Sequence, residues 1–264
     1  MSKSNTKTEI EEILEFAIAL ARDAGAIAMS YFGKNVERER KQDGSVVTIA
    51  DREAEQLMRR RIIERYPSDG IVGEEYGVAS GTSGRRWIVD PIDGTFSFTH
   101  GVPLFGVLVG VEVDGKPTVG VAHMPALQEM VEAATGMGCR WNGVRAKVSE
   151  IAALGDALVL CGDFYTNRAH GFGAAAERIQ AAAKERRGWG DCYGHVLVAT
   201  GRAEVALDPV MHIWDCAALA PILEEAGGTF TDWRGRSTID GGNAISTNGA
   251  LFREIMKLVQ APRE

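Results

Sequence analysis

Strand-like segments that follow one another between residues 104 and 144 constrain the fold of this chain most strongly. The first, residues 104–113, is an apolar run that ends at Asp114-Gly115, and residues 118–123 form the next. An Asp-Gly pair between two such runs is typical of a tight β-hairpin turn. Residues 129–134 and 139–144 continue the pattern. We therefore expect an antiparallel meander.

Helices precede this meander. Between residues 10 and 31 apolar residues recur at helical spacing, which predicts an amphipathic helix that ends near Gly33. A second helix is expected from about residue 50 to residue 66, and a short apolar strand at residues 87–89. The arginines of the second helix resemble a phosphate clamp, but a solvated helix face explains them better. They are Arg59, Arg60, Arg61 and Arg65.

After residue 149 the pattern alternates. Strands are expected at residues 157–161, 204–207 and 229–233, and helices at about 173–184, 193–200 and 214–226. The first half of the chain thus predicts an α+β arrangement with an antiparallel sheet, and the second half an α/β arrangement. No linker rich in Pro, Ser or Gly separates the halves.

Charge and composition narrow the class of protein. The 264 residues carry a formal net charge of -7, which argues against nucleic acid as a partner. It does not argue against a phosphorylated small molecule, because bound divalent cations reverse the charge of an acidic site. The beginning of the sequence is polar, and no segment approaches the length of an apolar membrane span, so we expect a cytoplasmic protein without membrane contact.

The segment WIVDPIDGT, residues 87–95, carries the clearest chemical signal. An apolar strand ends in Asp90 and Asp93, and two carboxylates released together suit hard Mg²⁺, with the carbonyl of Ile92 as a further oxygen ligand. Gly94 allows the backbone N–H groups of Gly94 and Thr95 to approach an anion such as phosphate. The alternative is a plain Asp-Pro and Asp-Gly turn.

Two weaker acidic signals accompany it. Glu74 and Glu75 follow an apolar pair, and adjacent residues of an extended chain point to opposite sides, so one could bind metal while the other supports a water. Asp215 begins a predicted apolar helix, where an acid also complements the helix dipole. Surface Glu-Glu pairs are common as well. Taken singly, both signals have these structural alternatives.

The combination resembles the inositol monophosphatase-like superfamily of Mg²⁺-dependent phosphatases. The resemblance rests on the order GEE, DPIDGT and WDxAA, and Lys41, Asp43, Thr48 and Asp51 add to it. It covers nearly the whole chain. It implies a layered αβαβα sandwich of the inositol monophosphatase and fructose-1,6-bisphosphatase type. A single domain over residues 1–264 is expected, with subparts of about 1–148 and 149–264, and a homodimer.

The resemblance also implies roles for individual residues. The expected ligands of two or three Mg²⁺ ions are Glu74, Asp90, the carbonyl of Ile92, Asp93 and Asp215. Thr95 and Glu74 would position the attacking water, with Asp51 and Glu75 in support. A non-catalytic member that only binds a phosphorylated ligand would be expected to lose a ligand or Thr95, and none is missing.

Two further stretches bear on the substrate. The segments around Asp191 and Asp208 look more like the histidinol-phosphate phosphatase branch than animal-type inositol monophosphatases. Asp191, Asp208 and Asp93, with His195 nearby, are therefore expected to contact L-histidinol phosphate, whose ammonium and imidazole groups suit acidic partners. A helix N-cap is the alternative for Asp191. An inositol or sugar phosphatase of broad specificity is the alternative function.

Overall fold

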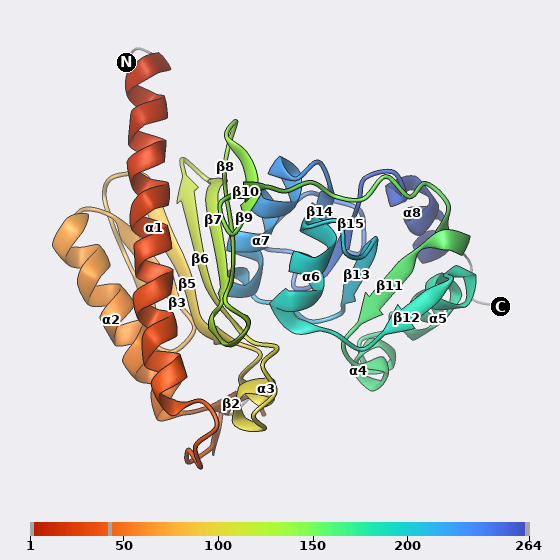
Figure 1. Ribbon diagram of the computed structural model, residues 1–264, viewed down its shortest axis with the longest axis horizontal. Helices are drawn as coiled ribbons and strands as arrows, with labels where there is room; N and C mark the ends of the chain where they lie inside the picture. Colours follow the sequence, from red (N-terminus) through yellow and green to blue (C-terminus); the bar gives the residue numbers. More distant parts are fainter. Residues whose placement is uncertain (1–2, 42–43, 262–264) are drawn as a thin grey trace.

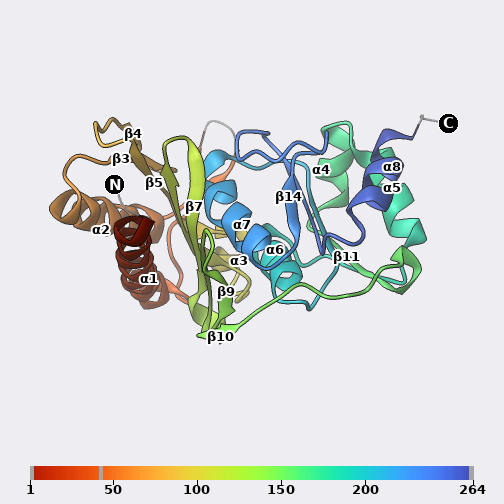
Figure 2. The same ribbon diagram turned by 90° about the horizontal axis from the view of Figure 1, so that it is seen from above.

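Layers of helices and sheets alternate in the order α–β–α–β–α in the computed structural model, which describes residues 3–41 and 44–261 (Figures 1 and 2). This is the layered α+β architecture that the resemblance implied. In the described part of the chain, none of the helices combines the length and the apolar character needed to cross a membrane.

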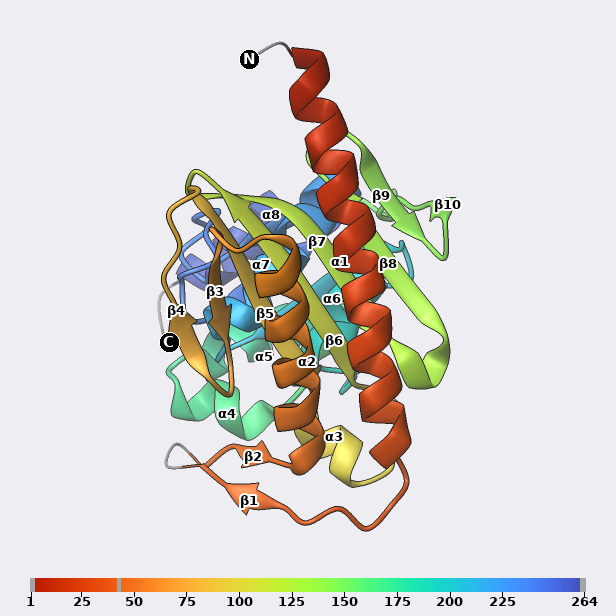
Figure 3. The ribbon, with the colours of Figure 1, turned by 90° about the vertical axis from the view of Figure 1, so that its left-hand side faces the viewer.

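Helices α1 (Lys3–Tyr31) and α2 (Ile49–Arg65) form the first layer and cover one face of the larger sheet (Figure 3). Helix α1 begins earlier than residue 10, where we expected it, and ends as predicted. Thr48 caps α2, because its side chain accepts a hydrogen bond from the N–H of Ala50. Leu20 of α1 and Met58 of α2 are fully buried against this sheet.

The larger sheet contains the predicted meander. Its strand order is β10-β9-β8-β7-β6-β5-β3-β4, and every pair is antiparallel except β3 with β5. The β6–β7 turn lies at Asp114-Gly115, both in the left-handed region. Residues 139–144 do not form one strand as expected, since a second left-handed turn at Asn142-Gly143 divides them. The strands are β3 (Gly70–Gly73), β4 (Gly77–Ala79), β5 (Arg85–Asp93), β6 (Gly106–Val113), β7 (Lys116–Met124), β8 (Glu129–Ala134), β9 (Gly138–Trp141) and β10 (Val144–Arg145).

Helices α6 (Asp191–Ala199) and α7 (Ile213–Glu225) form the middle layer. Helix α7 lies directly on β6 and β7, and two glycines make this approach close. A Cβ atom on Gly110 would lie 2.6 Å from the Cβ of Ala217, and one on Gly120 would lie 2.0 Å from the carbonyl oxygen of Ala218. The small residues of both elements therefore set the height of α7, and of Asp215 at its beginning, above the sheet.

The smaller sheet has the order β12-β11-β13-β15-β14 and mixes parallel and antiparallel pairs. Its strands are β11 (Leu158–Cys161), β12 (Glu185–Arg187), β13 (Val205–Asp208), β14 (Thr229–Thr231) and β15 (Ala244–Thr247). The outer helices are α4 (Phe164–Ala169), α5 (Gly173–Ala182) and α8 (Phe252–Gln260). The sequence interpretation missed α4, β12, β15 and α8. The remaining elements are α3 (Thr95–Thr99), the pair β1 (Glu39–Arg40) and β2 (Val46–Val47), and the 3-10 turns Pro125–Leu127 and Leu154–Asp156.

Three arginines of α2 lie near acidic residues other than the predicted metal ligands. Arg59 pairs with Glu55, Arg61 with Asp23, and Arg65 approaches Glu12. A helix-face role thus agrees with the structure better than a phosphate clamp.

Candidate active site

A β-bulge near the end of β5 brings two aspartates to the same side of the strand. Asp90 pairs with Leu108 and Asp93 with Gly106, so three steps along β5 oppose two steps along β6. In a regular strand, residues three apart would point to opposite faces of the sheet. The extra residue, next to Pro91, removes that conflict. Both carboxylates can therefore face one site.

Asp215 joins them from α7. One carboxylate oxygen from each of Asp90, Asp93 and Asp215 lies within 4.8 Å of the others. Asp215 also accepts a hydrogen bond from the N–H of His212 at 2.6 Å, so its role at the beginning of the helix and its place in the cluster coexist. The site is thus assembled by the β5 bulge and by the close packing of α7.

The electrostatics of the cluster favour a cation. Burial, and then the charges of Glu74, Asp93 and Asp215, raise the pKa of Asp90 well above its usual range. Burial chiefly raises the pKa of Asp215 as well, to about 7. Three crowded, hard oxygen donors of the same charge are the donor set that Mg²⁺ prefers, and the residues present fit that ion.

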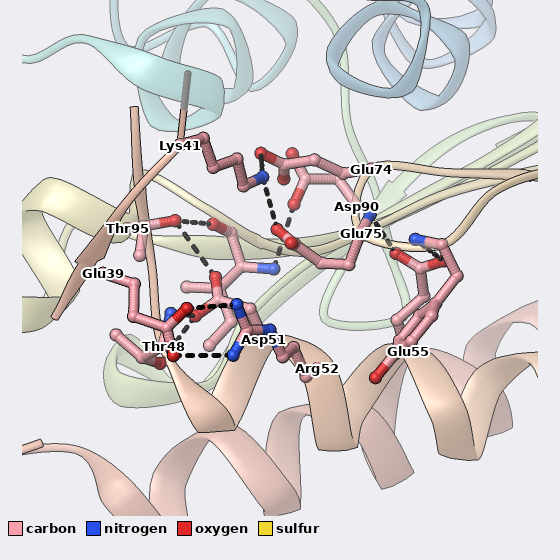
Figure 4. A network of polar contacts seen from close by, with 12 residues as sticks. Glu39, Lys41, Thr48, Asp51, Arg52, Glu55, Glu74, Glu75, Asp90 and Thr95 are labelled. Atoms are coloured by element: carbon pink, nitrogen blue, oxygen red, sulfur yellow. Dashed lines mark hydrogen bonds and ion pairs between the residues drawn. The ribbon is translucent and has the colours of Figure 1, made fainter. Parts of the chain in front are cut away.

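Glu74 and Glu75 follow the end of β3, and both form ion pairs with Lys41, as Figure 4 shows. The Lys41 ammonium lies 2.7 Å from Glu74 Oε1 and 2.6 Å from Glu75 Oε1. The charge of Glu74 contributes to the raised pKa values of Asp90 and Asp215, so Glu74 lies near the cluster, although it is not one of the three residues whose carboxylate oxygens come within 4.8 Å of one another. Asp43, which contributed to the resemblance, lies outside the described residues.

Thr95 and Asp51 are in contact although 44 positions separate them in the sequence (Figure 4). Thr95 Oγ1 lies 3.1 Å from Asp51 Oδ1 and 2.9 Å from the carbonyl oxygen of Ile92. The other oxygen of Asp51 accepts hydrogen bonds from the N–H and hydroxyl of Thr48, at 2.8 and 2.6 Å. Asp51 is thereby held in one orientation toward Thr95.

Gly94 connects β5 to α3 in a conformation that favours glycine. Its φ is 82°, and a Cβ there would lie 3.0 Å from the carbonyl oxygen of Leu104 and 3.1 Å from Asp191 Oδ2. The structure therefore places Gly94 and Thr95 at the beginning of α3, beside Asp191.

A cavity of about 560 Å³ is lined by Asp93 and Asp215 of the acidic cluster and by Asp191. Among the described residues that line it, none is Lys, Arg or His. Apolar side chains line the cavity as well, and Phe96, one of them, is 65% exposed. The acidic residues of the lining are Asp93, Asp163, Asp191, Asp208 and Asp215, and the apolar ones include Phe96, Leu104, Val210 and Met211.

Asp191 and Asp208 line this cavity from two elements. Asp191 is the first residue of α6 and makes no capping bond, since Gly190 is the N-cap; its side chain bonds to Ser97 instead. Its φ of 51° is uncommon for a residue with a side chain, although aspartate tolerates it better than most. Asp208 ends β13, and burial raises its pKa to about 8.

Asp163 is a cavity residue that the sequence interpretation missed. Its carboxylate accepts hydrogen bonds from the N–H groups of Tyr165 and Thr166 and caps α4. An aspartate just before a short helix was the available signal, but α4 was itself not predicted.

His195, expected near the substrate, does not line the cavity. It is 1% exposed, its Nδ1 lies 2.6 Å from Ser246 Oγ, and its ring lies against Phe230. Burial lowers its pKa to about 4, so the imidazole is neutral at physiological pH. It lies one helical turn beyond Asp191, inside the core, and the structure does not support a contact between His195 and substrate.

Comparison with known proteins decides the family. The model of the inositol monophosphatase family matches residues 9–262. This chain belongs to the inositol monophosphatase family. The predicted family and fold class are therefore confirmed, and the protein is a phosphatase of a metal-dependent family.

Individual relatives agree with this assignment. A histidinol-phosphatase of Chlorobaculum parvum is 44% identical over 252 residues, which cover 93% of this chain and 96% of that protein. A histidinol-phosphatase of Mycobacterium tuberculosis is 36% identical over 94% of this chain and 98% of its own length. A solved structure of an IMPase from Thermotoga maritima is 32% identical and superposes with a TM-score of 0.85, covering 94% of this chain and 96% of that one. Within the inositol monophosphatase family, the likeness to the histidinol-phosphatase branch is confirmed.

Proposed function

We propose that this phosphatase hydrolyses L-histidinol phosphate to L-histidinol and phosphate with the help of Mg²⁺, a reaction of histidine biosynthesis. The observation that carries the proposal is the cavity, which combines five aspartates with apolar side chains and has no basic residue among its described lining residues. A phosphate ester that also bears a positive charge suits these surroundings better than a neutral polyol. The two histidinol-phosphatase relatives support the same substrate.

The phosphate end of the substrate lies at the acidic cluster in this proposal. Glu74, Asp90, Asp93, Asp215 and the carbonyl of Ile92 would hold two or three Mg²⁺ ions. When bound, these ions would neutralise phosphate charge and lower the pKa of a water, so that it can lose a proton and act as the nucleophile near neutral pH. The backbone N–H groups of Gly94 and Thr95 would bind phosphate oxygens at the beginning of α3.

The attacking water is oriented by Thr95 and Glu74. Thr95 Oγ1 lies between Asp51 Oδ1 and the carbonyl oxygen of Ile92, which supports a relay in which Thr95 would accept a proton from that water and donate its own to Asp51. Burial raises the pKa of Asp51, which favours its acting as the acceptor. Glu75 supports Glu74 by sharing the Lys41 ammonium.

The end of the substrate that carries the ammonium and the imidazole would then face Asp191, Asp208 and Asp93. A carboxylate that accepts a hydrogen bond from an ammonium contributes about 1.5–3 kcal/mol, which corresponds to one to two decades of discrimination. Phe96 and Leu104, which also line the cavity, would offer apolar contacts to the imidazole ring.

An inositol monophosphatase, or a phosphatase of broad specificity for sugar and inositol phosphates, is the second candidate. The similarity to the Thermotoga maritima IMPase supports it, and carboxylates also accept hydrogen bonds from hydroxyl groups. This second function does not explain why the described lining residues of the cavity include no Lys, Arg or His.

A phosphate-release panel with and without Mg²⁺ separates the candidates. The substrates are L-histidinol phosphate, inositol 1-phosphate, fructose 1,6-bisphosphate and 3′-phosphoadenosine 5′-phosphate. We expect Mg²⁺-dependent release with the highest kcat/KM for histidinol phosphate. Equal or higher kcat/KM for another ester would reject the proposed substrate, and no release from any ester would leave only a ligand-binding role.

A further inference from the structure

We infer that Glu55 is a positioning residue that fixes the turn carrying Glu74 and thereby sets the affinity of the site for Mg²⁺. The inference rests on the proposed function in one respect, because it takes Glu74 as a metal ligand. Glu55 lies on α2, outside the set of residues that the family resemblance singled out.

The Glu55 side chain is fully buried, and its hydrogen bonds to backbone N–H groups go to one turn (Figure 4). Its Oε2 accepts a hydrogen bond from the N–H of Glu75 at 2.6 Å, and its Oε1 accepts one from the N–H of Tyr76 at 3.1 Å. Arg59, one helical turn further along α2, lies 3.0 Å from Oε1 and balances the charge. Hydrogen bonds from backbone to a buried carboxylate are strong, so they define where these two N–H groups point.

This turn decides the direction of Glu74. The hairpin is closed by the pair Gly73 and Gly77, which leaves Glu74, Glu75 and Tyr76 to reverse the chain between β3 and β4. Because the N–H groups of Glu75 and Tyr76 point at Glu55, the side chain of Glu74 can point toward the acidic cluster. Without the carboxylate, the N–H groups of Glu75 and Tyr76 would lose this shared partner, and the turn would lose the contacts that fix its orientation.

Gly73 shows how closely the carboxylate is packed against the backbone. A Cβ atom on Gly73 would lie 2.1 Å from Glu55 Oε1. The glycine has no positive φ, so its conformation does not itself exclude alanine. Alanine at position 73 would therefore disturb Glu55 without removing it, which provides a second, independent perturbation of the same contact.

One face of helix α2 carries two residues that contact the candidate site. Asp51 and Glu55 are four residues apart and so lie one above the other on that face. Asp51 contacts Thr95, and Glu55 contacts the turn of Glu74. A single rigid helix thus places both the residue proposed to orient water and a proposed metal ligand.

The test measures Mg²⁺ affinity by calorimetry in Glu55→Gln and Gly73→Ala, alongside steady-state kinetics. Glutamine keeps the shape but replaces one acceptor oxygen with a donor that faces an N–H group. Loss of a group that orients a metal ligand typically weakens metal binding about 10–100-fold, and we expect that range for Glu55→Gln. Because the reacting groups remain, kcat at saturating Mg²⁺ should fall by less than about threefold.

Glu225→Gln is the matched control. Its carboxylate also accepts two backbone hydrogen bonds of a loop, from Gly136 and Gly138 at 2.7 and 2.6 Å, but in the β8–β9 hairpin. We expect Glu225→Gln to lower the stability of the protein, because it weakens these two bonds, but to leave the Mg²⁺ affinity at the wild-type value.

The outcomes separate the inference from the proposed function. Wild-type affinity in both Glu55→Gln and Gly73→Ala would overturn the inference while the function stands. A wild-type protein that binds no Mg²⁺ would instead overturn the proposed function. If Glu55→Gln does not fold, as judged by circular dichroism, the affinity of Gly73→Ala decides by the same criterion.

Discussion

Single residues around the acidic cluster give the backbone the local shape that the site needs. The bulge after Asp90 turns Asp93 to the same side, and Gly94 turns the chain where a side chain would meet Asp191. Asp191 is the residue for which the sequence left two roles open. Its carboxylate lines the cavity and does not cap α6, so a role toward substrate is the stronger interpretation.

Asp191→Asn tests that role. Asparagine also tolerates a positive φ and can keep a hydrogen bond to Ser97, so the backbone is expected to be unchanged. Losing the charge should raise KM for L-histidinol phosphate about 10–100-fold, which corresponds to 1.5–3 kcal/mol. Glycerol phosphate is the control, and its KM should change less than about threefold. An equal rise for both esters would assign Asp191 a structural role only.

At the scale of elements, the position of α7 on the sheet controls the site. Its contact with β6 and β7 depends on Gly110 and Gly120, and Asp215 moves with the helix. Packing interactions of this kind transmit a displacement along a rigid helix to its end.

Gly120→Ala is therefore expected to impair both stability and catalysis. The added methyl group would lie 2.0 Å from the carbonyl oxygen of Ala218, and overpacking of this kind costs about 1–3 kcal/mol of unfolding free energy. Denaturant unfolding and kcat/KM are the measurements. Gly155→Ala is the control, because a Cβ there meets no atom within 4 Å. Equal stability of the two variants would contradict the packing argument.

The same scale shows what the sequence could reveal. The ends of β6, β7 and β8 were predicted within a few residues, because apolar runs and the Asp114-Gly115 turn mark them locally. Strand β12 was missed since Glu185, Arg186 and Arg187 have no apolar pattern at this edge of the sheet. Helix α4 has only 6 residues, too few for a periodic signal.

The candidate site, too, was predicted only in part from the sequence. Motifs named Asp90, Asp93, Asp215 and Thr95; the structure brings the three carboxylates together and places Thr95 against Asp51, while the roles of all four residues stay predictions. What the sequence could not show is packing between distant segments. The buried environment of His195, the bond from Glu55 to the turn of Glu74, and the capping of α4 by Asp163 all depend on tertiary contacts.

For the whole molecule, the acidic cluster is expected to lower stability until a cation binds. The pKa values of Asp90 and Asp93 are raised, and that of Asp215 is raised to about 7, each chiefly by burial. A carboxyl group with a raised pKa in the folded state loses stabilisation as pH rises through that value. The metal-free protein should therefore become less stable between about pH 4 and pH 7.

Asp90→Asn should reverse part of this loss. Without metal at pH 8 we expect its Tm to exceed that of the wild type by about 2–4 °C, which corresponds to roughly 1 kcal/mol. With Mg²⁺ at about 100 times its Kd, the wild type should gain about 2.7 kcal/mol and the variant almost none. Thermal unfolding with and without Mg²⁺ measures both effects. A full Mg²⁺ response in the variant would exclude Asp90 as a ligand.

The central claim is that an acidic cavity without a basic lining residue selects a phosphate ester that carries a positive charge. Its most direct test compares kcat/KM for L-histidinol phosphate with that for the same ester lacking the amino group, at saturating Mg²⁺. Loss of the ammonium should lower kcat/KM about 10–100-fold. Equal values for the two esters would contradict the claim.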